Sequence, residues 1–142
     1  MSKIAVVYWS GTGNTQAMAE KVLEGAKEAG AEADLYTASE FSDSQVDDYD
    51  ALAFGCPSMG SEQLEDSEFE PMFNSCEGKL KGKKLALFGS YGWGDGEWMR
   101  NWEEQCASDG AVLVCDSVIC NDAPDDEAQA ACAELGKALA EA

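Results

Sequence analysis

Histidine is absent from this sequence of 142 residues. Its absence excludes Ser-His and Cys-His nucleophiles, histidine general bases and histidine-ligated metals. Basic residues are also scarce, since 9 lysines and arginines stand against 28 aspartates and glutamates, a formal net charge of −19. That balance argues against nucleic acid and anionic membranes as partners and favours a protein partner with a basic face. The alternative is that the acidity serves only solubility.

No apolar run approaches the length that spans a membrane. No N-terminal stretch combines a basic region, a long apolar core and a small-residue cleavage site, so we expect no export signal and a cytoplasmic location. Cys-x-x-Cys pairs are missing as well, and we expect no metal site. We interpret the cysteines as reduced, buried, small hydrophobic residues of one domain that covers residues 1–142. They are Cys56, Cys76, Cys106, Cys115, Cys120 and Cys132.

The stretch from residue 4 to residue 15 organises the rest of the chain. Residues 4–9 form an apolar run that suits a strand buried on both faces. Six small residues follow, with two glycines and three hydroxyls, and then a helical pattern with Met18 and Val22 on its apolar face. A loop between a buried strand and a helix N-terminus offers free backbone N–H groups and the positive end of the helix dipole. These features together bind anions such as phosphate.

The details of this loop limit the kind of phosphate site. A P-loop ends in Gly-Lys-Ser/Thr, but no lysine lies between Lys3 and Lys21. A dinucleotide fingerprint needs a third glycine where this sequence has Gln16. The loop would therefore hold phosphate through neutral donors alone, and the alternative is a turn in which Ser or Thr caps the helix. The donors are the side chains of Ser10, Thr12, Asn14 and Thr15 and the backbone N–H groups of the loop, which includes Gly11 and Gly13.

Residues 10–15, Ser-Gly-Thr-Gly-Asn-Thr, resemble the FMN-phosphate loop of flavodoxins. The rest of the chain suits that family's α/β fold, because strand and helix patterns alternate along its length. Right-handed crossovers predict a flavodoxin-like, doubly wound, five-stranded parallel sheet of order 2-1-3-4-5 in a three-layer α/β/α arrangement. We expect an edge strand at residues 31–38, buried strands at 50–56 and 85–89, and a last strand that runs without interruption over 111–120.

Three loops follow the carboxyl ends of neighbouring strands and should meet at one edge of the sheet. Besides the phosphate loop, residues 57–63 offer Met59 and a carboxylate, and residues 89–96 offer Trp93 between two glycines. Glycine beside an aromatic ring lets the backbone approach a flat ligand while the ring covers its face. The loops predict a slot for a planar heterocycle between Met59 and Trp93. Packing alone is the alternative interpretation for Met59, Trp93 and Tyr91.

Both loops, and the segment at residues 121–124, resemble flavin-binding segments of the short-chain, clostridial-type flavodoxins. The resemblance implies non-covalently bound FMN, with its ring between Met59 and Trp93. It also implies that the Gly60–Ser61 peptide turns over on reduction to accept a bond from flavin N5–H, and that Glu62 accepts from N3–H. Pro57 and Ser61 depart from the residues common in the family. The resemblance further assigns FMN contacts to Pro57, Ser58, Ser90, Tyr91, Gly92, Gly94 and Asn121.

The resemblance implies an electron carrier without catalytic residues, which shuttles FMN between neutral semiquinone and hydroquinone at low potential. Carboxylates near the ring oppose the anionic reduced flavin, each by about 0.8 kcal/mol at about 10 Å and an effective dielectric of about 40. The acidic rim would also steer a monomeric carrier to basic docking faces of reductases and ferredoxin-dependent oxidoreductases. The rim carboxylates are Glu62, Glu65, Asp66, Glu68, Glu70, Asp95, Glu97, Asp122, Asp125, Asp126 and Glu127.

Two other classes compete with the carrier. An FMN-dependent NAD(P)H or quinone oxidoreductase usually needs a longer chain for a substrate pocket and a nicotinamide site, and this sequence has no spare segment. A receiver-type signalling domain needs an acidic cluster after the first strand and a phospho-acceptor aspartate after the third. The sequence instead has Ser-Gly-Thr at 10–12 and Cys-Pro-Ser at 56–58.

Overall fold

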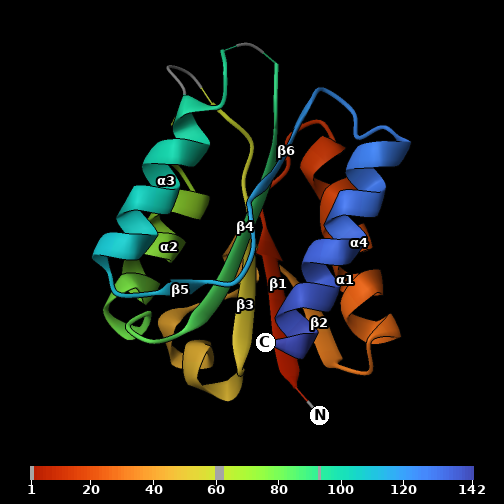
Figure 1. Cartoon of the computed structure of the whole chain (residues 1–142). Coiled ribbons are helices and arrows are strands. Elements are labelled where there is room, and N and C mark those ends of the chain that lie inside the picture. The colour runs from red at the N-terminus through yellow and green to blue at the C-terminus, as the bar shows by residue number, and fades with distance from the viewer. Residues whose placement is uncertain (1, 60–62, 93) are drawn as a thin grey trace.

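A parallel sheet runs through the middle of the computed structural model, which describes residues 2–59, 63–92 and 94–142 (Figure 1). The strand order is β2-β1-β3-β4-β5, and β6 pairs with β4. This confirms the doubly wound order predicted from the sequence, with its switch point between β1 and β3. The strands are β1 (Lys3–Tyr8), β2 (Glu32–Thr37), β3 (Ala51–Gly55), β4 (Lys84–Tyr91), β5 (Val112–Leu113) and β6 (Val118–Asn121).

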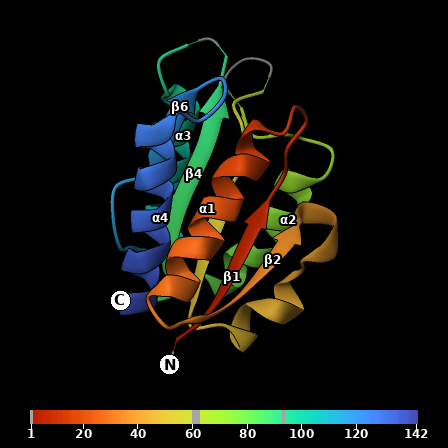
Figure 2. The same cartoon turned by 90° about the vertical axis from the view of Figure 1, so that its right-hand side faces the viewer.

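Two helices cover each face of the sheet. The pair α1 (Asn14–Glu28) and α4 (Asp126–Glu141) packs on one face, and α2 (Phe69–Cys76) and α3 (Glu97–Ser108) pack on the other (Figures 1 and 2). One buried cluster lies under each pair, so β1, β3 and β4 are covered on both sides. Three short 3-10 helices complete the described part: η1 (Ala38–Glu40), η2 (Asp43–Asp48) and η3 (Glu77–Lys79).

The apolar faces predicted for the helices are the faces that pack on the sheet. Their members recur at helical spacing and are buried in the structure, which confirms the periodicity argument. The edge position of β2 is also as predicted, with buried Ala33 between exposed Glu32 and Asp34. The buried residues include Met18 and Val22 in α1, Phe69, Met72, Phe73 and Cys76 in α2, Trp98, Trp102 and Cys106 in α3, and Ala128, Cys132, Leu135 and Leu139 in α4.

The last strand differs from the prediction, because it is interrupted. Only two residues separate Leu85 from Phe88 in β4, whereas four separate their partners Leu113 and Val118. Two extra residues therefore bulge out between β5 and β6, and the ladder with β4 breaks there. In this bulge the Ser117 hydroxyl donates to Glu103 Oε2 of α3 at 2.6 Å. Asp116 and Ser117, two residue types that are common in turns, interrupt the apolar run 111–120 at this point, and the prediction of an unbroken strand overlooked that signal.

The cysteines are free thiols in the structure, as predicted. Four are buried, while Cys115 and Cys120 are partly exposed. Burial raises the pKa of the Cys76 thiol to about 11 and the pKa values of Cys106 and Cys132 to about 12. These three thiols therefore stay protonated and unreactive at neutral pH. Separately, none of the helices in the described ranges is long and apolar enough to cross a bilayer.

Close contact between α1 and α4 holds the helix that carries the first loop. A Cβ added at Gly136 would lie 2.0 Å from the carbonyl oxygen of Val22, and one added at Gly25 would lie 2.0 Å from that of Ala133. Real Cβ atoms do not approach backbone this closely. The two glycines therefore permit the spacing of these helices.

Replacing Gly136 with alanine should force α4 away from α1 and destabilise the protein by about 1–3 kcal/mol, as overpacking does. Urea unfolding measures the change. The control is Gly78→Ala, whose Cβ would meet nothing within 4 Å, and its effect should stay within about 0.5 kcal/mol. Equal effects of the two substitutions would contradict the close-contact interpretation.

Candidate functional site

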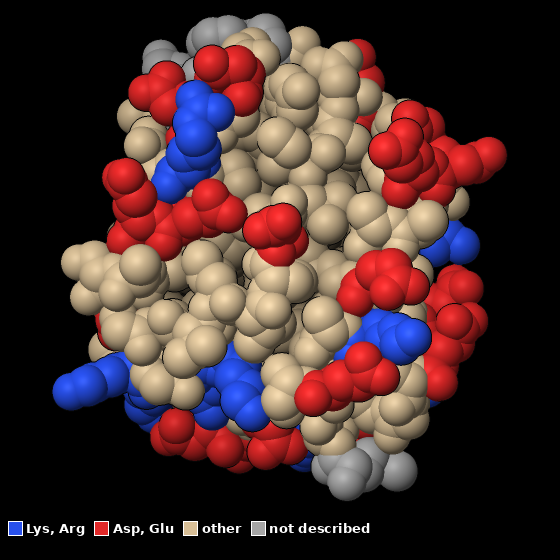
Figure 3. Space-filling view, in the orientation of Figure 1, with Lys and Arg blue, Asp and Glu red and all other residues tan. Residues whose placement is uncertain are grey.

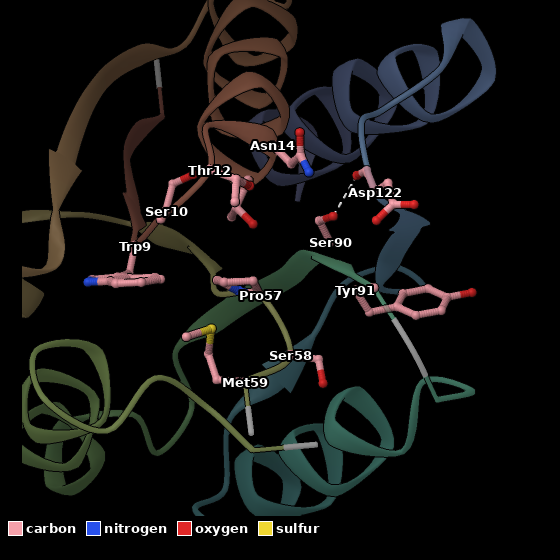
Figure 4. Close-up of a pocket in the computed structure, with 13 residues that line it drawn as sticks. Trp9, Ser10, Thr12, Asn14, Pro57, Ser58, Met59, Ser90, Tyr91 and Asp122 are labelled. Carbon is pink, nitrogen blue, oxygen red and sulfur yellow. Dashed lines mark hydrogen bonds between the residues drawn. The ribbon is translucent and has the colours of Figure 1, made fainter. Parts of the chain in front are cut away.

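One pocket lies where loops leave the carboxyl ends of β1, β3 and β4 (Figure 4). In the view of Figure 4, Ser10, Thr12 and Asn14 lie on one side of this pocket, and Ser58 and Met59 lie on the other. A further segment, just after β6, brings in Asp122. The lining residues are Trp9, Ser10, Gly11, Thr12, Asn14, Thr15, Pro57, Ser58, Met59, Ser90, Tyr91, Gly92 and Asp122.

The loop after β1 presents backbone donors rather than a capped helix end. The N-cap residue of α1 is Gly13, in the left-handed conformation at φ 96° and ψ −7°, and no side chain caps the helix. The Ser10 hydroxyl instead accepts a bond from the Gly13 N–H at 3.0 Å, which fixes the turn. The alternative interpretation, a Ser or Thr N-cap, is therefore wrong. The first N–H groups of α1 have no partner within the helix and point toward the loop.

Thr15 is the buried donor of this loop. Its side chain is only 1% exposed, and its hydroxyl makes no hydrogen bond within the described structure. Buried hydroxyls almost always have a partner, because desolvation without one is costly. Among the described residues, the Thr15 hydroxyl lies without a partner at a helix N-terminus, beside other neutral donors. It is therefore available to donate a hydrogen bond to an anion bound in the pocket.

The loop after β3 is tied to its neighbours by backbone bonds. The Ser58 N–H donates to the Ser90 carbonyl at 3.0 Å, and Met59 and Gln63 exchange two bonds of 2.8 and 2.9 Å. The Met59 side chain is 37% exposed and lines the pocket. The alternative that Met59 fills the core is therefore wrong.

The end of β4 is held against the segment after β6. The Ser90 hydroxyl donates to the carbonyl of Asp122 at 2.6 Å, and the Asp122 N–H donates to the Tyr91 carbonyl at 2.9 Å (Figure 4). Asp122 has a positive φ of 58°, which is unusual for a residue with a side chain. The Tyr91 ring packs against Trp98 with centroids 5.5 Å apart, so Tyr91 has a packing role as well as lining the pocket.

Most of the predicted site residues that the structure describes line this one pocket. Gly13, Gly94 and Asn121 do not; the Asn121 side-chain amide instead donates to the Tyr91 carbonyl at 3.4 Å. The predictions for Gly60, Ser61, Glu62 and Trp93 fall outside the described residues. Trp9 had no predicted site role, and Asp122 was expected on the acidic rim and within the segment 121–124, but not as a residue that contacts FMN. Trp9 is the last residue of the apolar run, directly before the loop, and that position was the available signal.

The predicted acidic residues lie in different environments. Glu65 is only 5% exposed, so it is not part of an exposed rim as expected. Asp95 forms a surface ion pair with Arg100 at 3.0 Å, and Asp125 caps α4 by accepting from the Ala128 N–H at 2.8 Å. Within the described lining there is no lysine or arginine, and Asp122 is the one charged residue.

Comparison with known proteins gives consistent matches. The Flavodoxin family model matches residues 6–136. A flavodoxin from Megasphaera elsdenii is 47% identical over 142 residues, with 98% of this chain and 99% of that protein covered. One from Clostridium beijerinckii is 47% identical over 135 residues, with 95% and 97% covered. The solution structure of the two-electron reduced Megasphaera elsdenii flavodoxin superposes with a TM-score of 0.90 at 46% identity, covering 98% of this chain and 99% of that chain. These matches confirm the short-chain, clostridial-type resemblance and the fold.

Asp122 allows a test of backbone strain beside the pocket. Asp122→Gly and Asp122→Ala remove the same charge and keep both backbone bonds, but only glycine adopts a positive φ without cost. We expect the glycine variant to be more stable than the alanine variant by about 1 kcal/mol. Urea unfolding of the two proteins measures this difference. Equal stability, or a more stable alanine variant, would show that Asp122 is not strained.

Proposed function

This chain belongs to the flavodoxin family, and we propose on that basis that it shuttles single electrons at low potential, between neutral semiquinone and hydroquinone FMN. It is an FMN-binding electron-transfer protein and not an enzyme. The proposal concerns the electron step, its potential, the residues that hold FMN and the docking face.

The structural observation that supports FMN binding at this pocket is the unpaired, buried Thr15 hydroxyl at the start of α1. It supports placing the FMN phosphate among Ser10, Thr12, Thr15 and the free N–H groups of the α1 N-terminus. Neutral donors suffice for a phosphate there, because the helix dipole adds a positive end. Asn14 also lines the pocket and would contribute its amide.

The flavin ring would lie beside Met59, which reaches the pocket with its side chain partly exposed. The apolar thioether would exclude water from one face of the ring. The two backbone hydrogen bonds between Met59 and Gln63 keep Met59 in place. Trp93 on the other face, and the roles of Gly60, Ser61 and Glu62 at the ring edge, remain part of the proposal. When bound, FMN supplies one-electron redox chemistry.

The charge of the pocket supports a low potential. Its described lining holds no lysine or arginine to offset negative charge, and it already contains the carboxylate of Asp122. Negative charge that develops in such a pocket is opposed rather than compensated. The protein therefore disfavours the anionic reduced cofactor and makes it a stronger reductant.

The docking face would be the pocket end of the molecule. Four of the nine basic residues, Lys79, Lys81, Lys83 and Lys84, instead come just before or at the start of β4, at the opposite end of the sheet. Figure 3 shows blue atoms gathered in the lower part of this face with red atoms beside and below them, while red atoms also flank the upper part, where a blue side chain lies among them. A redox partner with a basic face, such as a reductase or a ferredoxin-dependent oxidoreductase, would approach a monomer of this chain at the pocket end, away from these four lysines.

Thr15→Val tests the phosphate site. The substitution keeps the shape of the side chain but removes a donor to a charged group, which is worth about 1.5–3 kcal/mol. We expect FMN affinity to fall by about tenfold or more, while riboflavin, which lacks the phosphate, binds unchanged. Titration by flavin fluorescence measures both. The apoprotein should be no less stable, since an unpaired buried hydroxyl is lost. An equal loss for both ligands would contradict a phosphate contact.

Stepwise anaerobic reduction of the FMN-loaded protein at neutral pH tests the electron step. A blue intermediate spectrum before bleaching, followed by a second electron at low potential, is the expected result. Bleaching in one two-electron step would overturn the proposed one-electron shuttle. Free FMN in the same cell is the control, because it lacks the stabilisation that the protein provides.

A further inference from the structure

Glu65 is a buried carboxylate beside the pocket. It was predicted to lie on the exposed acidic rim, and that position does not explain its burial. It is 5% exposed, and the other buried polar residues of the described structure, Thr15 and Ser90, both line the pocket. Glutamate is almost never this buried unless it is paired. No lysine or arginine pairs with Glu65 in the described structure. Its partners are all neutral donors.

Those donors belong to the residues at the start of α2, Ser67 to Phe69. Glu65 Oε1 accepts from the backbone N–H groups of Glu68 and Phe69, each at 2.8 Å. Oε2 accepts from the Ser67 N–H at 2.9 Å and from the Ser67 hydroxyl. Burial alone would raise the pKa of Glu65, but these hydrogen bonds outweigh it and lower the pKa below its usual value. The side chain is therefore a carboxylate that caps α2 from outside the helix.

The backbone of Glu65 is fixed at its other side. Its N–H donates to the Cys56 sulfur at 3.3 Å, so the chain returns to the end of β3 from which the loop departed. Between these two points, Met59 and Gln63 are joined by their pair of backbone bonds. Glu65 thus closes the loop that carries Met59 and attaches its end to α2.

The α2 helix is a rigid support for this attachment. Phe69 and Phe73 are fully buried and stack at 6.2 Å, and both contact Trp102 of α3 edge-on. A loop end bound to this aromatic cluster has little freedom to move. The position of Met59 at the pocket therefore depends on a link that runs through the Glu65 carboxylate.

We propose that Glu65 is a positioning residue for the flavin, which clamps the Met59 loop to the N-terminus of α2 and so sets the separation of the two one-electron potentials. The inference rests on the proposed function, since it assigns the Met59 loop to the flavin. It differs from a rim-charge role, in which only the charge of Glu65 would matter. Under the clamp role, the length of the side chain matters as much as its charge.

Two substitutions vary charge and reach independently. Glu65→Asp keeps the negative charge but shortens the side chain by one CH₂, so it cannot keep all four bonds. Asp66→Asn removes a negative charge from the exposed neighbouring residue and leaves the clamp intact. FMN affinity and both one-electron potentials are measured for each variant and for the unaltered protein.

The clamp predicts that Glu65→Asp weakens FMN binding by about tenfold, the effect of losing one bond to a charged group. It also predicts a smaller separation of the two potentials. Asp66→Asn should leave the affinity within about twofold and move only the second potential slightly upward. If Glu65→Asp instead behaves like the unaltered protein, or lowers stability without moving the potentials, the inference is wrong.

A milder variant guards against misfolding. Ser67→Ala removes one donor and leaves the carboxylate, and it should give the same changes as Glu65→Asp at smaller size; no change in the potentials would overturn the clamp. Measurements on the unaltered protein distinguish failure of the proposed function from failure of the inference about Glu65. If it binds no FMN, both the proposed function and this inference fail. If it binds FMN with two resolved potentials but neither variant shifts them, only the inference fails.

Discussion

The structure depends on one physical constraint, which is the binding of an anion by a strongly acidic chain without a local positive charge. The solution lies in the backbone, where Gly13 takes a left-handed conformation and begins α1 without a side-chain cap. The N–H groups freed in this way, together with the buried Thr15 hydroxyl, form a neutral cradle at the positive end of a helix dipole. A lysine here would bind phosphate more strongly, but it would also stabilise a reduced, anionic ligand. Under the proposed function, neutral donors would hold the phosphate without raising the potential.

The sequence could predict the features that depend on local pattern. Alternating buried strands and amphipathic helices predicted a parallel sheet, for which the flavodoxin-like order is the known doubly wound solution at this size. Loops at strand ends located the pocket, because parallel strands place their carboxyl ends together. What it could not predict depends on contacts between distant residues. Glu65 and Asp66 are adjacent acidic residues that the sequence does not distinguish, yet Glu65 is buried and Asp66 is exposed. The difference arises from the α2 N–H groups and the Cys56 sulfur, which only the folded chain brings together.

This difference changes how the acidity of the chain is interpreted. A net charge of −19 suggests a uniform field, but the carboxylates near the pocket have separate roles. Asp125 caps a helix and Asp95 is paired with Arg100, so both are partly compensated locally. Asp122 faces the pocket without such a partner cation in its described lining. Among the described residues, Asp122 is therefore the carboxylate placed to act on a bound ring, while Asp95 and Asp125 stabilise the segments that carry them.

The interrupted last strand contributes to the same site. If the register of β5 continued unbroken along β4, the strand would need two fewer residues to reach Tyr91, which now pairs with Asn121. Asp122 would then extend beyond the pocket by about 6–7 Å, given a rise of about 3.3 Å per residue. The two-residue bulge prevents this and leaves the Asp122 carbonyl level with the Ser90 hydroxyl, which donates to it at 2.6 Å. The bulge takes up chain length at the strand edge, where it costs little, and aligns a pocket residue whose position depends on the register between the strands.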